Sequence, residues 1–271
     1  MSLIDFKEKN IFEDSVTGHV RKANEDACEI ASPTPNGDVF VVCDGMGGHA
    51  GGATASKIAV KSIIDYLQRE KYPNPREALY DALEYANRQI LDYAGKHIEL
   101  RGMGTTACIL LLQDNEAWIA HAGDSRIYLF LGKERQLHRI TKDHSYVQTL
   151  VDIGDITDEQ AETHPDKNCI TKALGIKPDI QSEVALNPIL PKNGDIFLIC
   201  SDGLSGMIND TTIEGVLTND ETSIKEKGRK LIQLALDNDG LDNITVQLIQ
   251  INNSPHVESI FKSYNPKKVR L

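Results

Sequence analysis

Residues 39–45 read Val-Phe-Val-Val-Cys-Asp-Gly, a short apolar run that ends directly in an acid and a glycine. Residues 196–203 repeat the pattern as Ile-Phe-Leu-Ile-Cys-Ser-Asp-Gly. Runs of this length rich in β-branched residues are typical of buried strands, and Asp-Gly is typical of the turn after a strand. In a third case, Asp242 lies just before the apolar run over residues 244–251. The sequence therefore predicts three buried strands, each with an aspartate at one end.

Further strands and helices are expected around these three runs. Residues 105–140 are predicted to form a four-stranded meander, with turns near 114–115, 123–124 and 132–133. Apolar residues recur at helical spacing in two long stretches, and a third helix is expected nearer the end of the chain. The three predicted helices cover residues 53–68, 78–98 and 223–238. Strands and helical blocks do not alternate strictly, so we expect an α+β fold of layered, mainly antiparallel sheets.

Composition limits the class of protein and its partners. The chain has 271 residues, 40% of them hydrophobic, as expected of a soluble globular protein. Its 29 basic and 40 acidic residues give a net charge of −11, which argues against nucleic acid as a partner. No run approaches the roughly 18 apolar residues that a membrane span needs. The sequence begins without a signal peptide, and its five cysteines are scattered, so we expect a reduced, cytoplasmic protein.

No linker divides the chain, so residues 1–251 are predicted to form one domain. Residues 252–271 are polar and include four basic side chains, and we expect this tail to be poorly ordered. A docking role for the tail is the less favoured alternative.

The aspartates after the predicted strands are candidate metal ligands. Asp44, Asp202 and Asp242 are separated by 158 and 40 residues, so only the fold could bring them together. A fourth acid, Asp124, lies at a predicted turn of the meander. Each acid alone is explained by an ordinary turn. Together they could bind hard cations such as Mg²⁺ or Mn²⁺, which prefer oxygen ligands, and the carbonyl of Gly45 could approach such an ion closely.

Residues 21–26 place one arginine beside two acids, as Arg-Lys-Ala-Asn-Glu-Asp. By itself this hexapeptide is most simply an exposed charge run. Beside a carboxylate metal centre, however, the planar guanidinium of Arg21 could bind two oxygens of a phosphate group.

These residues lie within eight short motifs that occur in one order along the chain. The motifs are RKANED (21–26), VCDGMGGH (42–49), GTT (104–106), HAGDSRIY (121–128), TKDHS (141–145), HPDKNCITKALG (164–175), LICSDGL (198–204) and DNITV (242–246). In this order, over about residues 15–251, they resemble the metal-dependent protein phosphatase family, also called protein phosphatase 2C, and its bacterial branch in particular. The resemblance implies a four-layer αββα sandwich, in which helices flank two antiparallel sheets.

The same resemblance implies a role for each candidate residue. Asp44 is expected to bridge two Mn²⁺ or Mg²⁺ ions, with the Gly45 carbonyl completing one of them and Asp202 and Asp242 binding the other. Glu25 and Asp26 are expected to orient water, and Asp124 with Asp202 to bind a weaker third ion. The implied chemistry is direct attack on phosphorus by a hydroxide that bridges the metals, while Arg21 clamps the phosphate.

One position departs from the animal members of the family, which carry a histidine after the Asp-Gly pair. Met46 stands there in this chain, so the proton donor for the leaving group is open. Water on a third metal is the first candidate, and His49 is the second. Residues 146–168 occupy the position of the family's flap, which we expect to influence substrate docking and binding of the third metal, or else to be only a solvated acidic face.

Three functions are weighed against each other. The favoured one is a phosphoserine and phosphothreonine protein phosphatase, expected to be monomeric and to oppose a Ser/Thr kinase. The alternatives are a non-catalytic phosphoprotein-binding or signalling module on the same fold and a phosphatase of another phosphorylated substrate. Degenerate members lose metal-binding aspartates, whereas all four are present in this chain, which favours catalysis.

Overall fold

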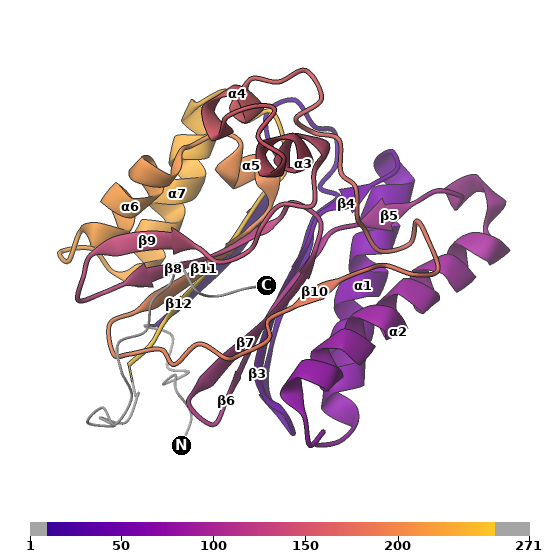
Figure 1. Ribbon diagram of the computed structural model, residues 1–271, viewed down its shortest axis with the longest axis horizontal. Helices are drawn as coiled ribbons and strands as arrows, with labels where there is room; N and C mark the ends of the chain where they lie inside the picture. Colours follow the sequence, from indigo (N-terminus) through magenta and orange to yellow (C-terminus); the bar gives the residue numbers. More distant parts are fainter. Residues whose placement is uncertain (1–9, 253–271) are drawn as a thin grey trace.

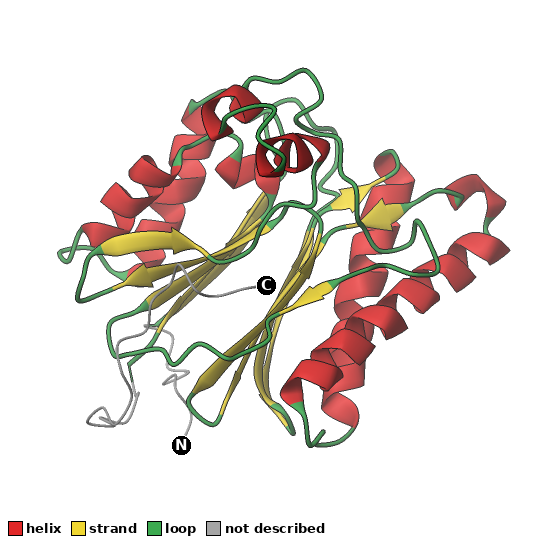
Figure 2. Ribbon diagram, viewed as in Figure 1, coloured by secondary structure: helices red, strands yellow, loops and turns green. Residues whose placement is uncertain are grey.

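Two five-stranded antiparallel sheets lie face to face, with helices on both outer faces (Figures 1 and 2). The computed structural model describes residues 10–252. One sheet, the β12 sheet, has the order β1 (Ile11–Val16), β12 (Ile244–Gln250), β11 (Ile196–Cys200), β8 (Arg126–Leu131) and β9 (Gln136–Arg139). The other, the β3 sheet, has the order β10 (Glu183–Val184), β7 (Glu116–Ala122), β6 (Ala107–Gln113), β3 (Gly37–Cys43) and β2 (Ala27–Thr34). A short pair, β4 (Gly45–Met46) with β5 (Gly104–Thr105), stands beside them.

The helices form the two outer layers and a small group at one end. The β3 sheet is covered by α1 (His49–Arg69) and α2 (Pro75–Lys96), which a 3₁₀ turn, η1 (Ile98–Leu100), follows. The β12 sheet is covered by α5 (Asp202–Ser205), α6 (Asp210–Thr218) and α7 (Ile224–Asp237). Two short helices, α3 (Tyr146–Asp152) and α4 (Asp158–Glu162), lie at the end of the sandwich where α5 lies (Figure 1). The predicted αββα sandwich is therefore confirmed.

The continuous apolar runs are explained by three buried layers. Along β3, Val39 and Val41 point toward α1 and α2, whereas Phe40 and Val42 point into the space between the sheets. Side chains of a strand alternate between its two faces, so a strand buried on both faces needs apolar residues at every position. β11 follows the same rule, with its alternate residues divided between the inter-sheet layer and the layer under α5, α6 and α7.

Local sequence fixes where the long helices begin. Asn74 precedes α2, and its side chain accepts hydrogen bonds from the backbone of Arg76 and Glu77, while Pro75 takes the first helical position. At α7, Ser223 and Glu226 form a reciprocal capping box. The three helices predicted from the sequence are all present, and each begins within four residues of its predicted start.

The predicted four-stranded meander is wrong in its pairing. β6 pairs with β7 and β8 pairs with β9, as a meander requires, but β7 and β8 lie in different sheets. Residues 123–125 carry the chain across from one sheet to the other. Strand periodicity shows which side chains are buried, not which strand lies alongside, and here β8 pairs with β11 instead. The crossing places Asp124 between the two sheets.

The described residues bear on a membrane span but hardly on the C-terminal tail. Among residues 10–252 there is no helix long and apolar enough to cross a bilayer. Apart from Asn252, the tail expected to be poorly ordered lies outside the described residues.

Candidate active site

The candidate acids gather at one end of the sandwich. Asp44 follows β3, Asp202 follows β11, and Asp242 precedes β12, so the three strands bring them to the end marked by α5 and β4 in Figure 1. Asp124 arrives from the crossing between β7 and β8. The charges of Asp26, Asp202 and Asp124 all act on Asp44, and Asp44 also shares a hydrogen bond with Asp202. The structure therefore joins residues up to about 200 positions apart into one acidic cluster.

Burial and mutual repulsion change the protonation of this cluster. Asp44 and Asp202 keep some solvent contact, yet desolvation is still the largest cause that raises the pKa of each, and neighbouring carboxylates add to it. The same causes raise the pKa of Asp26 to about 7 and that of Asp124 to about 8. Carboxylates this close do not all ionise without a compensating positive charge.

Three carboxylate oxygens of the cluster lack a partner within the described chain. The Oδ1 atoms of Asp26, Asp124 and Asp202 are buried and accept no hydrogen bond from residues 10–252. A buried acceptor without a donor costs free energy, which a coordinated cation would offset. Oxygen donors with several negative charges are the set that Mn²⁺ and Mg²⁺ prefer, so the residues present fit divalent cations.

Two threonines hold the backbone of Asp44. The N–H of Asp44 donates to Oγ1 of Thr106 at 2.9 Å, and the N–H of Thr106 donates to the Asp44 carbonyl at 2.8 Å. Oγ1 of Thr105 donates to the same carbonyl at 2.8 Å. These bonds fix the point from which the Asp44 side chain projects. The GTT motif thus supports the acid through its side-chain oxygens.

Glycines let three backbone segments meet at the cluster. A Cβ on Gly45 would lie 2.2 Å from the carbonyl oxygen of Gly52 and 2.5 Å from that of Glu25. No side chain fits such a contact, because both neighbours are backbone atoms. Gly45 is therefore required by close packing, and this packing sets the position of its own carbonyl.

Asp26 and Glu25 are anchored from the opposite sheet. Oδ2 of Asp26 accepts hydrogen bonds from Ser201 at 2.8 Å and Thr245 at 2.6 Å, and so orients the unpartnered Oδ1. The N–H of Glu25 donates to Oδ1 of Asn243 at 2.9 Å, and the amide of Asn243 donates to the Ala23 carbonyl at 3.1 Å.

Asn243, Ser201 and Thr106 are site residues that were not predicted from the sequence. The available signal is their position, because each lies directly beside a candidate acid or within the motif that follows one. Only the structure shows that their polar atoms form hydrogen bonds with residues of other strands and loops.

Arg21 reaches the cluster from the segment after β1. Its Nη2 atom lies 2.6 Å from Oδ2 of Asp242, and this hydrogen bond raises the pKa of the guanidinium. The Arg21 side chain is 45% exposed, which places it on the solvent side of the cluster. A guanidinium carries five donors, so one bond to Asp242 leaves others for a phosphate.

His49 is the first residue of α1, and its side chain lies outside the described part of the structure. Its role as a proton donor stays a prediction. Met46, which stands where animal members carry a histidine, belongs to the short strand β4.

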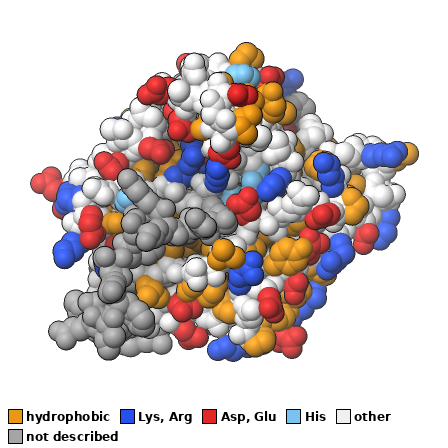
Figure 3. Space-filling view, viewed as in Figure 1, with side chains coloured by type: hydrophobic (Ala, Val, Ile, Leu, Met, Phe, Trp, Pro, Cys, Tyr) orange, Lys and Arg blue, Asp and Glu red, His pale blue; other side chains and the backbone are white. Residues whose placement is uncertain are grey.

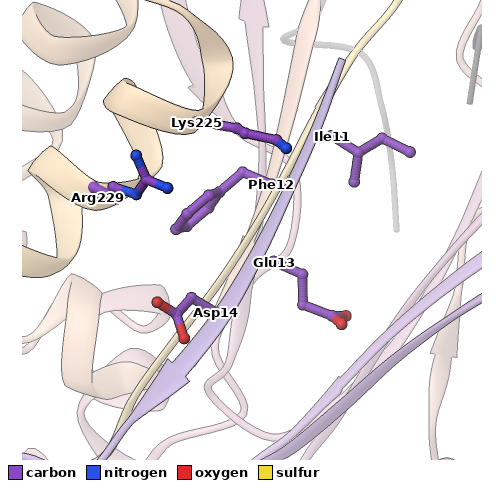
Figure 4. Close-up of a pocket in the computed structure, with 6 residues that line it drawn as sticks. All are labelled: Ile11, Phe12, Glu13, Asp14, Lys225 and Arg229. Atoms are coloured by element: carbon purple, nitrogen blue, oxygen red, sulfur yellow. The ribbon is translucent and has the colours of Figure 1, made fainter. Parts of the chain in front are cut away.

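A cavity of about 520 Å³ lies elsewhere, against β1 and the first turns of α7 (Figure 4). It is lined by Ile11, Phe12, Glu13, Asp14, Lys225 and Arg229. None of the candidate site residues lines this cavity. The acidic cluster, not this cavity, is the candidate active site.

Comparison with known proteins decides the family. Residues 18–245 match the family model described as Protein phosphatase 2C, which is more than half of the chain. The chain belongs to the protein phosphatase 2C family. Every acid of the cluster lies inside the matched range. The resemblance inferred from the eight motifs is confirmed.

Relatives of this phosphatase 2C chain cover nearly all of its described length. Protein phosphatase PhpP of Streptococcus pneumoniae is 38% identical over 239 residues, which is 87% of this chain and 94% of PhpP. The crystal structure of serine/threonine phosphatase Stp1 from Staphylococcus aureus has a TM-score of 0.83 at 35% identity, covering 93% of this chain and 98% of Stp1. The catalytic domain of the serine/threonine protein phosphatase PstP, solved with two manganese ions, has a TM-score of 0.78 at 33% identity, covering 90% and 98%. These relatives support the bacterial branch.

Proposed function

We propose that this member of the protein phosphatase 2C family hydrolyses phosphoserine and phosphothreonine in proteins at the acidic cluster, without a covalent phosphoenzyme. The protein is a metal-dependent serine/threonine protein phosphatase, as the family match and the named relatives support. The active site is placed at the acidic cluster because its buried carboxylates have oxygens without a hydrogen-bond partner in the described residues. A non-catalytic module is not favoured, because all four aspartates are present and gathered at one place.

The cluster residues would divide the cations between them. Asp44 would bridge two Mn²⁺ or Mg²⁺ ions, the Gly45 carbonyl would complete one, and Asp202 with Asp242 would bind the other. Asp124 with Asp202 would hold a weaker third ion. When bound, such cations lower the pKa of coordinated water and neutralise charge that develops on the phosphoryl group.

Other residues of the chain would position the reactants. Asp26 is held by Ser201 and Thr245, so its Oδ1 is fixed in direction and can accept a proton of an attacking water. Glu25 would act beside it, and Arg21 would hold two phosphate oxygens with the donors that Asp242 does not use. The proton for the leaving group would come from water at the Asp124 position or from His49.

Buried thiols offer no competing nucleophile. Burial raises the pKa of Cys43 and Cys108 and raises that of Cys200 to about 12. These thiols stay protonated at neutral pH, whereas a nucleophilic cysteine is a thiolate.

Several finer points complete the proposal. Residues 1–251 would form the catalytic domain, with residues 146–168 as a flap that affects substrate docking. The substrates would be phosphoproteins of an opposing Ser/Thr kinase, and the protein would act as a monomer in the cytoplasm. The cofactor in the cell would be either Mn²⁺ or Mg²⁺.

The test is phosphate release from a phosphothreonine peptide and from p-nitrophenyl phosphate, with Mn²⁺ and with chelator. We expect turnover only with metal, no turnover in Asp44→Ala or Asp202→Ala, and reduced turnover with weaker metal activation in Asp124→Ala. Asp65→Ala is the matched control, because this acid lies on the exposed side of α1 and pairs with Lys61 on the same helix. Full activity in Asp202→Ala would show that the metal assignment is wrong.

A further inference from the structure

A second group of titratable side chains lies beneath the flap. His121 is on β7, Glu183 is opposite it on β10, and His144 precedes α3. The two imidazole rings stack with centroids 4.5 Å apart and planes within 14°. One candidate ligand atom from each of the three residues lies within 4.8 Å of the others, and both histidines are buried. By geometry alone the group could be a transition-metal site.

The positions of the protons argue against a metal. Nε2 of His121 lies 2.8 Å from the Lys142 carbonyl, which only accepts, so Nε2 carries the proton and Nδ1 is bare. Nδ1 of His144 accepts the N–H of Gly123 at 3.1 Å. Burial, with His121 nearby, lowers the pKa of His144 to about 4, so its ring is neutral and its single proton is on Nε2. A metal would need that nitrogen bare.

The surroundings of Nε2 fit a neutral ring that carries its proton on this nitrogen. Nε2 of His144 lies 2.9 Å from Oε1 of Glu183, at ion-pair distance though not aligned as a hydrogen bond. Nζ of Lys172 donates to the same oxygen at 3.2 Å. The negative charge of Glu183 is thus balanced by the ammonium group of Lys172, so this carboxylate does not need a metal ion to compensate it.

His144 is bonded twice to the turn that carries Asp124. Its Nδ1 accepts from Gly123, and its own N–H donates to the Gly123 carbonyl at 2.9 Å. Gly123 has a φ of +110°, and a Cβ there would lie 2.6 Å from the side chain of Thr106. The turn is therefore enclosed between the threonine that supports Asp44 and the ring of His144.

On its other side, His144 belongs to the base of the flap. Its carbonyl accepts the N–H of Thr171 at 2.8 Å, and the N–H of Tyr146 donates to the Cys169 carbonyl at 2.8 Å. Ser145 caps α3 by accepting the N–H of Gln148 at 3.2 Å. Both ends of the flap thus meet within two residues of His144.

We propose that His144 is a positioning residue that clasps the Asp124 turn to the base of the flap, so that the flap and the weak cation site move as one unit. The coupling to a cation rests on the proposed third ion at Asp124. The clasp itself rests only on the bonds between His144 and Gly123. No covalent step is involved.

Two substitutions separate the clasp from general packing. His144→Asn keeps an acceptor where Nδ1 lies and removes Nε2, whereas His144→Gln keeps a polar atom near Nε2 and removes the acceptor. We expect hydrogen exchange of residues 121–125 and 145–152 to be faster in His144→Gln and to stay near the wild-type rate in His144→Asn. Residues 196–200 of β11 should exchange at the wild-type rate in both variants. Wild-type exchange over residues 121–125 in His144→Gln would overturn the clasp.

Direct Mn²⁺ binding, followed by calorimetry and by electron paramagnetic resonance, tests the coupling. In His144→Gln we expect the most weakly bound Mn²⁺ to have about a tenfold lower affinity, as when other residues that support a metal ligand are changed. The affinities of the more tightly bound ions should not change. In His144→Asn all affinities should be near those of the wild type. The maximal rate should recover at saturating Mn²⁺. Faster exchange with unchanged Mn²⁺ affinities would overturn the coupling. If Asp124→Asn binds as many ions as the wild type, the proposed third cation site at Asp124 is wrong. That result concerns the proposed function and leaves the clasp unaffected.

Two further measurements do not depend on the folding of His144→Gln. If His144→Gln does not fold, exchange in the wild type with increasing Mn²⁺ serves instead, and occupation of the weak site should slow exchange in residues 145–152 as well as 121–125. If hydrogen exchange in residues 145–152 does not change with Mn²⁺, the coupling is overturned. Binding of one Zn²⁺ to the chelator-treated protein, lost in His121→Gln, would overturn the proton assignment.

Discussion

Two acids of the active site are held by hydroxyl groups from other parts of the chain. Ser201 and Thr245 hold Asp26, and Thr106 holds the backbone of Asp44. The hydroxyl of Thr106 also pairs with that of Ser125 at 2.7 Å, inside the turn that carries Asp124. A single hydroxyl therefore connects the positions of two carboxylates.

Thr106→Val removes that hydroxyl while keeping the shape of the side chain. The N–H of Asp44 and the hydroxyl of Ser125 lose a buried partner, which costs about 1–3 kcal/mol of unfolding free energy. We also expect weaker Mn²⁺ binding, because Asp44 is less well fixed. Urea denaturation and Mn²⁺ titration measure the two effects. Thr54→Val is the control, because it removes a hydroxyl that donates only within α1, to the Ala50 carbonyl, and equal losses in both variants would contradict the prediction.

At the scale of elements, β1 and α7 meet through one glycine. A Cβ on Gly228 would lie 2.0 Å from Cδ1 of Phe12, so the helix approaches the strand as closely as a bare backbone allows. Gly215 in α6 is different, because a Cβ there would have no atom within 4 Å. The two glycines serve unrelated purposes although both lie inside helices.

Gly228→Ala and Gly215→Ala should therefore change stability in opposite directions. Overpacking against Phe12 is expected to cost about 1–3 kcal/mol, whereas alanine at the open site should stabilise by about 0.4–1 kcal/mol. Thermal and urea denaturation measure both. The phosphatase rate well below the melting temperature should stay at the wild-type level, since neither residue touches the cluster. Stabilisation by Gly228→Ala would contradict this packing.

Element positions were predictable wherever the local pattern was long. β11 coincides with the apolar run over residues 196–200, which is unbroken because both faces of the strand are buried. The partner of β8 was not predictable, because residues 123–125 look like any Gly-Asp turn and give no sign of a change of sheet. The acids were found from their places beside strands, but Asn243 acts through a backbone contact that only the fold creates.

At the scale of the whole molecule, the net charge of −11 has two different origins. Acidic and basic side chains are interspersed over the face in Figure 3, as on an ordinary solvated surface. The cluster instead concentrates acids in a partly buried place, where Asp26 and Asp124 are each less than a tenth exposed. This second group links global stability to pH and metal.

The chelated protein should lose stability as pH rises. The folded pKa values of Asp26 and Asp124, about 7 and about 8, lie above those of the unfolded chain. Raised values mean that the folded state binds more protons, so the stabilisation is complete below about pH 4 and is lost as pH rises through 7 to 8. We expect a loss of a few kcal/mol between pH 5.5 and 8.5.

Mn²⁺ should remove this loss, because cations replace the protons. Urea denaturation at pH 5.5, 7.0 and 8.5, with chelator and with Mn²⁺, measures both curves. Equal stability of the chelated protein at all three pH values would mean that the cluster is not protonated in the folded state.

The pairing of β1 with β12 also determines where the chain could be circularly permuted. The N–H of Gln250 donates to the Asn10 carbonyl at 2.9 Å, so residues 10 and 250 lie side by side and residue 252 is only two residues further along the chain. Asp242 is at the other end of β12, roughly 20 Å away at the rise of a strand. A circular permutant could therefore join residue 252 to residue 10 and have its new termini in the turn at 114–115. The new link and the new termini would then all lie at the end of the sandwich opposite the acidic cluster.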